Sequence, residues 1–240
     1  MSSASPICDE SKSLPKSSAT PIVFVVDDDI SVRESIEGLI YGAALRCKTF
    51  ASAQEFLVHP RVSGPSCLVL DVNLPDLNGL DLQKRLRDRA DMPIIFITGF
   101  VDVPMTVQAM KAGAIEFLTK PFRSDVLLSA IRSALRCSQT ALDYQVEMRA
   151  IRDAYASLSP REREVMALVV SGLLNKQVGG ELGITEITVK AHRGKVMQKM
   201  KADSLADLVR MASSLGVSHG SFDARNLNPD FAAASVASAA

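Results

Sequence analysis

Short apolar runs alternate with amphipathic segments along residues 21–137. Four runs of mostly apolar residues and one short, less apolar run at 45–50 end at turn signals, which is typical of strands. After each run, apolar residues recur every three or four positions, as on one face of a helix. Strict alternation of strand and helix predicts a doubly wound α/β domain with a parallel five-stranded sheet. We expect the strands at 22–26, 45–50, 67–70, 93–97 and 114–118.

Capping residues mark where the intervening helices begin. Ser52, followed three positions later by Glu55, matches a capping box. Asp102 can cap the helix before the last strand, and we interpret Asp29 and Asp76 as cap or turn residues. The expected helices cover 31–43, a segment after Ser52, a segment marked by Leu80, Leu82 and Leu86, a segment after Asp102, and 124–137.

The second half of the chain has a helical pattern throughout. Residues 138–157 are polar, contain no Gly or Pro, and predict a helical linker that can continue the helix before it. Residues 158–216 then contain four short amphipathic helices separated by glycine turns, which predicts a small all-α domain. Ser159, Asn175 and Thr185 are the expected N-caps of its first three helices.

The third of these helices, expected over 186–200, is basic and amphipathic. Residues 186–201 carry five Lys and Arg residues against one Glu, a net charge of +4. A short helix, a glycine turn and a basic helix form the helix-turn-helix plan, in which cations neutralise phosphates and reach base edges. The apolar positions that we expect to face the core are Ile187, Val189, Val196 and Met200.

Overall composition narrows the class of protein. The 240 residues include 27 basic and 27 acidic side chains, so net charge says nothing about partners. Four cysteines without CxxC or zinc spacing predict free thiols in a reducing compartment. The chain shows no apolar signal segment and no apolar run of about 18 residues, so we expect a cytoplasmic protein that does not enter a membrane. Residues 1–20 and 217–240 are expected to be disordered.

Polar side chains follow four of the five expected strands. Asp27 and Asp28 follow the first strand, Asp71 the third, Thr98 the fourth and Lys120 the fifth. The C-terminal ends of parallel strands meet at one edge of a sheet, where such folds place their chemistry. Three close carboxylates repel one another unless a cation is present, and Mg²⁺ accepts carboxylates, waters and a phosphate oxygen. With an ammonium and a hydroxyl beside them, these groups predict a phosphoryl-handling site.

The ordered set of motifs resembles the receiver domain of two-component response regulators. The motifs are Val-Val-Asp-Asp-Asp at 25–29, Asp71 shortly before Leu-Pro at 74–75, Thr-Gly at 98–99 and Lys-Pro at 120–121. The resemblance covers about half of the chain and implies the flavodoxin-like strand order of that family. It also implies that Asp71 accepts a phosphoryl group from a cognate histidine kinase.

The same resemblance implies roles for the groups around the phosphoacceptor. Asp28, Asp71 and the backbone carbonyl of Asn73 would bind Mg²⁺ directly, and Asp27 would act mainly through water. Lys120 would pair with the phosphoryl oxygens. The peptide bond between Lys120 and the proline after it would be cis, which X-Pro chemistry permits.

A conformational switch is also implied by the resemblance. Thr98 would hydrogen-bond the phosphoryl group, and Phe117, at the family's aromatic switch position, would move inward as Thr98 is drawn to that group. The surface of the fourth helix and fifth strand would then form a homodimer, with Val107 and Lys111 as expected contacts.

The second half resembles the LuxR-type helix-turn-helix of the NarL/FixJ response regulators. The matching segments are Leu-Ser-Pro-Arg-Glu-Arg-Glu-Val at 158–165, Asn-Lys-Gln-Val at 175–178 and Thr-Val-Lys-Ala-His-Arg at 188–193, and residues 103–114 point toward FixJ. The resemblance implies a transcription regulator, not an enzyme, that binds promoter DNA as a dimer and acts with RNA polymerase. One departure is Gly179-Gly180, where the family usually has Ala first. Two helical glycines cost about 1 kcal/mol each, so we expect a loosely held helix.

Position on the basic helix predicts which residues contact DNA. In the groove we expect Lys190 and Arg193, with Ala191 and Gly194 on the same approach surface. His192 can contact a phosphate or pack inside the domain, and we favour packing. The residues expected to contact phosphates are Thr188, Lys195 and Lys199.

Two other functions stay open. Asp71-Val-Asn73 is similar to the aspartyl nucleophile of haloacid-dehalogenase-like phosphatases, although the acidic pair precedes it on another strand and no substrate cap is visible. Turnover of phosphate esters would support that enzyme. The other is a constitutive DNA-binding protein with a vestigial receiver, against which the complete set of site residues argues. Equal DNA affinity for wild type and Asp71→Asn, with and without a phosphodonor, would support it.

Overall fold

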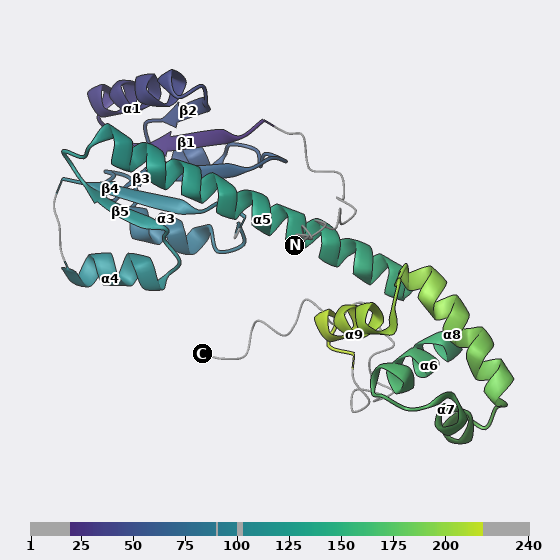
Figure 1. Ribbon diagram of the computed structural model, residues 1–240. Coiled ribbons are helices and arrows are strands. Elements are labelled where there is room, and N and C mark those ends of the chain that lie inside the picture. The colour runs from purple at the N-terminus through teal and green to yellow at the C-terminus, as the bar shows by residue number, and fades with distance from the viewer. Residues whose placement is uncertain (1–19, 90, 100–102, 218–240) are drawn as a thin grey trace, which may run out of the picture. The chain divides into compact units, whose positions relative to one another are not determined.

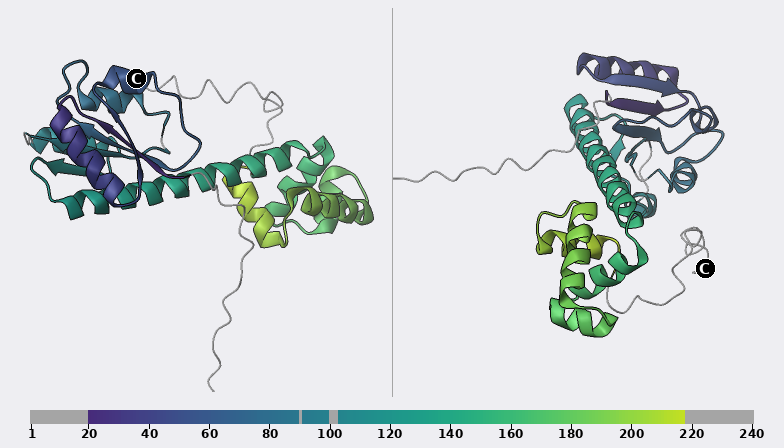
Figure 2. Two further views of the ribbon diagram at one scale, coloured as in Figure 1. Left: turned by 90° about the horizontal axis from the view of Figure 1, so that it is seen from above. Right: turned by 90° about the vertical axis from the view of Figure 1, so that its right-hand side faces the viewer.

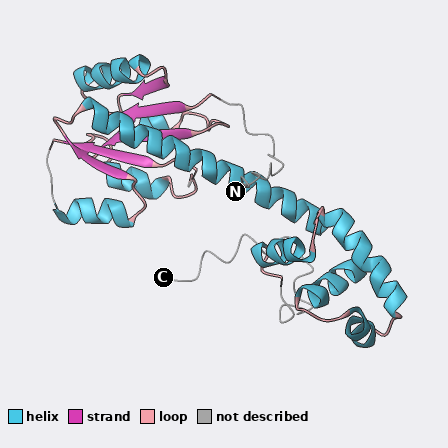
Figure 3. Cartoon of the chain, in the orientation of Figure 1, coloured by secondary structure: helices cyan, strands magenta, loops and turns pink. Residues whose placement is uncertain are grey.

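The computed structural model describes residues 20–89, 91–99 and 103–217. Contacts divide the chain into two compact units, residues 1–145 and 146–240. All strands of the described residues belong to the first unit, whereas the second is helical (Figure 3). Within the described part of the chain, no helix is both long enough and apolar enough to cross a membrane.

The first unit is built on a five-stranded parallel sheet with the strand order β2-β1-β3-β4-β5 (Figure 1). This order confirms the predicted doubly wound fold. Val26 at the end of β1 pairs with Leu70 of β3, so the polar residues that follow β1 and end β3 meet at one edge. The strands are β1 Ile22–Val26, β2 Arg46–Phe50, β3 Ser66–Asp71, β4 Ile94–Thr98 and β5 Glu116–Thr119.

Alternate strand residues enter two separate hydrophobic cores. Phe24 and Leu68 belong to the core on the side of α2, α3 and α4, whereas Val25 and Val69 belong to the core on the side of α1 and α5. Burial on both faces explains why β1, β3 and β4 are nearly continuous apolar runs. Figure 2 shows helices on both sides of the sheet. The helices are α1 Ile30–Gly42, α2 Ala53–Leu57, α3 Gly79–Arg85, α4 Val103–Lys111 and α5 Ser124–Ala156.

Helix caps in this unit follow the sequence pattern. Asp29 is the N-cap of α1, which confirms its interpretation as a cap or turn residue. The Ser52 hydroxyl caps α2 by accepting from the backbone N–H of Glu55 at 3.1 Å. Asp76 accepts from the Gln54 N–H in the first turn of α2, at 2.9 Å. Each carboxylate or hydroxyl therefore satisfies a helix N–H that would otherwise lack a partner.

The last strand begins at Glu116, not at the predicted Ala114. The Ala114 N–H donates to the Ala109 carbonyl at 3.1 Å and so closes the C-terminal turn of α4. Gly113, with φ of +93°, permits that turn. The apolar run thus starts inside a helix-ending motif, which periodicity alone does not reveal. Asp102, the predicted cap of α4, lies outside the described residues.

Helix α5 runs unbroken from Ser124 to Ala156, so the predicted fifth helix and the predicted helical linker form one helix. Ser138, in its middle, is fully buried. Its hydroxyl accepts from the Ser66 N–H at 3.0 Å and donates to the Asp91 carbonyl at 2.5 Å. These bonds satisfy two backbone groups at the edge of the first unit that bears the N-terminal ends of the strands.

Four short helices form the described remainder of the second unit, as predicted. Ser159 caps the first within a complete capping box, and Thr185 caps the third. One core cluster includes Met166, Val196 and Leu208, together with Met148 from the end of α5. A smaller cluster lies between α6, α7 and α8. The helices are α6 Pro160–Val170, α7 Asn175–Leu182, α8 Glu186–Met200 and α9 Leu205–Ser214.

Two predictions for this unit are wrong. Asn175 is the first residue of α7 rather than its cap; Leu174 stands at the cap position and its N–H donates to Gln177 Oε1 at 2.8 Å. Ile187 does not face the core, because 80% of its surface is exposed. It lies two residues before the buried Val189, and two residues turn a helix by about 200°.

The segments predicted to be disordered lie almost entirely outside the described residues, which begin at Thr20 and end at Val217. Val217, assigned from sequence to the C-terminal tail, packs against the core cluster that contains Leu208. Its N–H donates to the Ala212 carbonyl at 2.9 Å. Packing in the second unit therefore extends to the last described residue.

Candidate functional site

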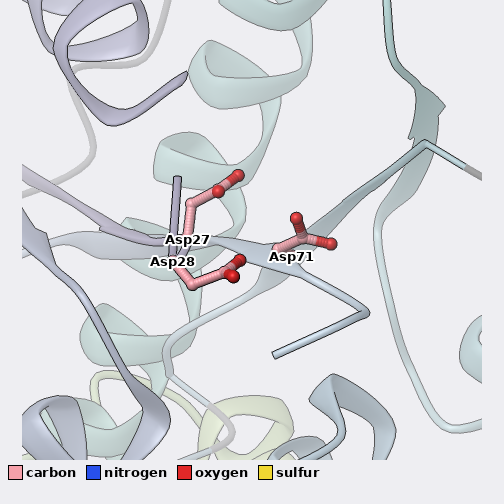
Figure 4. Close-up of side chains that lie close together, drawn as sticks. All are labelled: Asp27, Asp28 and Asp71. Carbon is pink, nitrogen blue, oxygen red and sulfur yellow. The ribbon is translucent and has the colours of Figure 1, made fainter. Parts of the chain in front are cut away.

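Three carboxylates meet at the C-terminal ends of β1 and β3 (Figure 4). One oxygen from each of Asp27, Asp28 and Asp71 lies within 4.8 Å of the others. Asp27 is fully buried and Asp71 is 6% exposed, whereas Asp28 is open to solvent. The two strands are neighbours in the sheet, so residues far apart in sequence come together. The predicted acidic cluster therefore forms, with one side accessible to water.

Lys120 supplies a positive charge to this cluster. Its Nζ donates to Asp71 Oδ2 at 2.5 Å and to Asp27 Oδ2 at 2.6 Å. Lys120 follows β5 directly, and its bond to Pro121 is cis, as the resemblance implies. Burial by itself would lower the pKa of Lys120, but the hydrogen bonds and charges of the two aspartates outweigh it and raise that pKa. The ammonium group therefore stays charged at neutral pH.

Asp27 is a buried carboxylate in a cluster of three acidic side chains with one lysine. Burial raises the pKa of Asp27 above its ordinary value, and the charge of Asp71 raises it further. Hydrogen bonds from Lys120 and from the Asp29 N–H oppose this rise only in part. A divalent cation with oxygen ligands would offset the excess charge. The donor set, with one exposed carboxylate where waters have access, fits Mg²⁺.

Asn73 connects the third strand to the fourth. Its N–H donates to Asp71 Oδ1 at 3.0 Å, and its side-chain amide donates to Thr98 Oγ1 at 3.3 Å. Thr98, the last residue of β4, is fully buried. The predicted hydroxyl therefore lies beside the acidic cluster. The sequence analysis assigned a role only to the backbone carbonyl of Asn73 and missed the role of its side chain. The sequence signal for that role is an amide side chain two residues after Asp71.

Arg33 is a site residue that the sequence analysis missed. Its guanidinium donates to the backbone carbonyls of Asp27 at 2.7 Å and Asp28 at 2.9 Å. It therefore holds the loop that carries two of the three carboxylates. An arginine in the first turn of a predicted helix usually faces solvent, so only its closeness in sequence to the acidic pair could have indicated this role.

The predicted switch and dimer residues lie on the side of α4 and β5. The half-buried Phe117 packs its ring against Phe96, with the ring centroids 6.1 Å apart. On α4, Val107 is 46% exposed and Lys111 is also exposed. The two α4 side chains are thus accessible to a partner, while Phe117 contacts the core between the sheet and α2, α3 and α4.

Helices α7 and α8 form a tight helix-turn-helix. Gly183 ends α7 in the left-handed conformation, with φ of +64°, and Thr185 begins the next helix. At Gly179 an added Cβ would lie only 2.7 Å from the carbonyl oxygen of Ile184, so this glycine lets the turn pack directly on α7. An added Cβ at Gly180 would meet nothing within 4 Å. Close packing against the turn therefore explains why this chain has glycine at position 179, where the family usually has alanine.

The outer side of α8 presents part of the predicted DNA contacts. Lys190, Ala191 and Gly194 are exposed and share one helix face, because they are spaced by three and four residues. Lys195 is exposed beside this face. Thr188 is half-buried, and its hydroxyl is hydrogen-bonded to that of the N-cap Thr185, at 2.9 Å.

Two other predicted DNA contacts make internal bonds. Arg193 is half-buried and donates to Asn175 Oδ1 at 3.2 Å. Lys199 donates to Glu162 Oε2 at 2.6 Å and to the Ser157 carbonyl at 3.2 Å. The bonds from Lys199 and from the Ser159 N–H lower the pKa of Glu162 to about 2. Either cation would have to exchange these bonds to reach DNA.

Both parts of the chain match known domain families. Residues 23–132 match the response regulator receiver domain, and residues 156–212 match the bacterial regulatory proteins of the luxR family. The chain therefore belongs to the two-component response regulators that join a receiver domain to a LuxR-type DNA-binding domain. This is a family of transcriptional regulators, as the sequence resemblance predicts.

Particular relatives cover both domains. Nodulation protein W of Bradyrhizobium diazoefficiens is 50% identical over 204 residues, which cover 85% of this chain and 90% of that protein. Response regulator protein TmoT of Ectopseudomonas mendocina is 45% identical over 195 residues, with 81% and 89% covered. Transcriptional regulatory protein FixJ of B. diazoefficiens is 40% identical over 196 residues, with 81% and 96% covered. The solved structure of the response regulator StyR has a TM-score of 0.72 at 46% identity, covering 81% of this chain and 99% of that one.

Proposed function

We propose that Asp71 is the phosphoacceptor of this response regulator and that a cognate histidine kinase donates the phosphoryl group. The observation that carries the proposal is the ammonium of Lys120, 2.5 Å from the Asp71 carboxylate. A carboxylate is a nucleophile, and an adjacent fixed cation stabilises the charge that the incoming phosphoryl oxygens bring. Both groups lie at the edge of the sheet where the exposed Asp28 gives solvent access to the site.

The surrounding residues have distinct roles in this proposal. Asp28, Asp71 and the Asn73 carbonyl would hold Mg²⁺, with Asp27 acting through water. Bound Mg²⁺ would offset negative charge on the phosphoryl oxygens. An oxygen of Asp71 accepts the phosphoryl group from the histidine nitrogen, whose bond to phosphorus breaks. Lys120 then pairs with a phosphoryl oxygen.

Phosphorylation would act on the side of α4 and β5. It adds a charge of about −1.5 to −2 at one position. Thr98, now bonded to the Asn73 amide, would turn toward the phosphoryl group, and Phe117 would move inward. The exposed α4 residues Val107 and Lys111 would then pack against a second copy of the chain. A dimer places two recognition helices on two half-sites of DNA.

The output is sequence-specific binding to promoter DNA. Lys190, Ala191 and Gly194 would enter the groove, with Arg193 beside them if it leaves Asn175. Because promoter DNA and RNA polymerase would be its partners, we propose that the protein acts in the cytoplasm. The proposed segments are a receiver at 21–137, a helical linker at 138–157 and a DNA-binding domain at 158–216. The phosphate contacts would come from Thr188, Lys195 and Lys199.

DNA binding and oligomeric state test this function together. Wild type and Asp71→Asn are compared with Mg²⁺, with and without the phosphoryl mimic beryllofluoride. We expect wild type to dimerise and bind DNA more tightly with the mimic, and Asp71→Asn to show no response because it lacks the acceptor carboxylate. If neither protein responds, the receiver does not control DNA binding and the constitutive alternative is favoured.

A further inference from the structure

Ile187 is the most exposed large apolar side chain in the described part of the chain, with 80% of its surface accessible. It lies in the first turn of α8, two residues after the N-cap Thr185. Single exposed apolar residues are common on protein surfaces, so exposure alone implies no function. The inference comes from the surface on which Ile187 lies.

Ile187 shares a helix face with the exposed residues of the proposed DNA contact. Spacings of three, four and seven residues place Lys190, Ala191 and Gly194 on the same side of α8. The opposite side carries Val189, which is fully buried in the domain core. Ile187 is thus the one large apolar side chain of α8, a fully described helix, that remains exposed.

The neighbours of Ile187 on this face extend little above the helix backbone. Ala191 has a single side-chain carbon, and the Cβ that Gly194 lacks would meet nothing within 4 Å. Lys190 is drawn toward Glu186 by an ion pair of 3.0 Å. A partner can therefore approach this face of α8 closely, and Ile187 projects toward it as an apolar group.

DNA offers one apolar group in the major groove, the C5-methyl of thymine. In helix-turn-helix proteins the first turns of the second helix contact the base edges. A β-branched isoleucine has few rotamers in a helix, so it loses little freedom when such a contact forms. We propose that Ile187 is a specificity-determining residue that recognises the C5-methyl of a thymine in the target site. The proposal rests on the proposed DNA-binding function and extends it to one base.

The test begins with full-length protein in Mg²⁺ and beryllofluoride. A random duplex library is used to select the preferred site, and each thymine of that site is then replaced singly by deoxyuridine, which lacks only the C5-methyl. At one thymine we expect wild type to lose about fourfold in affinity, the ratio that corresponds to ~0.8 kcal/mol per buried methyl-sized group. Ile187→Ala should bind the two duplexes equally at that position.

A matched control separates this contact from a general loss of exposed apolar surface. Val58, at the end of α2 in the first unit, is 72% exposed. Val58→Ala should keep the full sensitivity to the thymine methyl. Circular dichroism and the melting temperature of Ile187→Ala should match wild type, because an exposed side chain contributes little to stability.

Two results would overturn the proposal, and they differ from each other. If wild type selects a site but no thymine is sensitive to loss of its methyl, or if Ile187→Ala shows the same sensitivity as wild type, Ile187 does not recognise thymine. If wild type selects no site above random duplex, DNA recognition itself fails, and the proposed function fails with it.

Discussion

The ammonium nitrogen of Lys120 lies 2.5 Å from Oδ2 of Asp71, so the proposed phosphoacceptor is already paired with a positive charge. The same nitrogen also binds Asp27, which is fully buried. One lysine thus neutralises part of a cluster of three carboxylates. On phosphorylation this cation would exchange a carboxylate oxygen for a phosphoryl oxygen, a small movement that keeps it paired throughout.

Lys120→Ala should lower stability and increase the dependence on Mg²⁺. Without the ammonium, Asp27 and Asp71 repel each other, and we expect the free energy of unfolding to fall by about 1 to 3 kcal/mol in metal-free buffer. Added Mg²⁺ should then raise the melting temperature of the variant more than that of wild type. Differential scanning calorimetry with and without Mg²⁺ measures both effects; an equal shift in the two proteins would contradict the charge imbalance.

Arg33→Ala should weaken Mg²⁺ binding although it removes no carboxylate. Arg33 binds the carbonyls of Asp27 and Asp28 and so fixes the loop that presents their side chains. Loss of such a supporting group typically costs about tenfold or more in metal affinity. Isothermal titration with Mg²⁺ measures the change. Arg132→Ala, at an exposed position of α5, is the control and should bind Mg²⁺ like wild type.

Gly179 and Gly180 should respond in opposite ways to alanine. At Gly180 an added Cβ meets nothing within 4 Å, so Gly180→Ala should stabilise the domain by about 0.5 to 1 kcal/mol through its better helix propensity. At Gly179 the new Cβ would lie 2.7 Å from the Ile184 carbonyl oxygen, and the turn would have to shift. Gly179→Ala should therefore destabilise. Urea unfolding of both variants decides this, and equal effects would argue against the packing reason.

Because of the Glu162–Lys199 ion pair, we expect the free energy of unfolding of the second unit to fall in acid. The pKa of Glu162 is lowered from 4.5 to about 2, so the folded state binds this proton less readily than the unfolded state. The pair therefore stabilises the fold fully above about pH 4.5, and the contribution is lost as pH falls toward about 2. Glu162→Gln should lower stability by about 1 to 3 kcal/mol at pH 6.

The difference between Glu162→Gln and wild type is the informative quantity, because other carboxylates titrate in the same range. Thermal melting at a series of pH values should show this difference shrinking between about pH 4.5 and about pH 2. Lys199→Met, which removes the other partner of the ion pair, should show the same pH-dependent difference from wild type. A difference that stays constant with pH would mean that the ion pair does not contribute.

Several features follow from local sequence alone. Apolar runs and capping residues predicted the strands of the sheet and most helix starts, since periodicity and caps depend on residues close together in the chain. The convergence of Asp27, Asp28, Asp71, Thr98 and Lys120 was also predictable. In a parallel sheet the C-terminal ends of the strands share one edge, so the residues that end the strands must meet.

Other features depend on which residues meet across long distances in sequence. The bond of Ser138 to Ser66 joins residues that the chain places 72 positions apart, and that of Lys199 to Glu162 spans 37. No periodic pattern marks such partners. The exposure of Ile187 has the same origin, because local patterns do not specify which face of a helix the neighbouring elements cover. The two-residue error at the start of β5 is different, because it comes from the local turn at Gly113 that ends α4, which periodicity does not reveal.

By itself, the sequence determined the class of fold, the acidic site and the two-domain plan of this response regulator. The tertiary structure decided how each site residue is held. Arg33 binds the backbone of the acidic loop, the Asn73 amide binds Thr98, and the expected DNA contacts Arg193 and Lys199 make bonds to other helices. The physical reason is that secondary structure responds to nearby residues, whereas a side chain's partners and exposure are set by packing between elements that only the folded chain brings together.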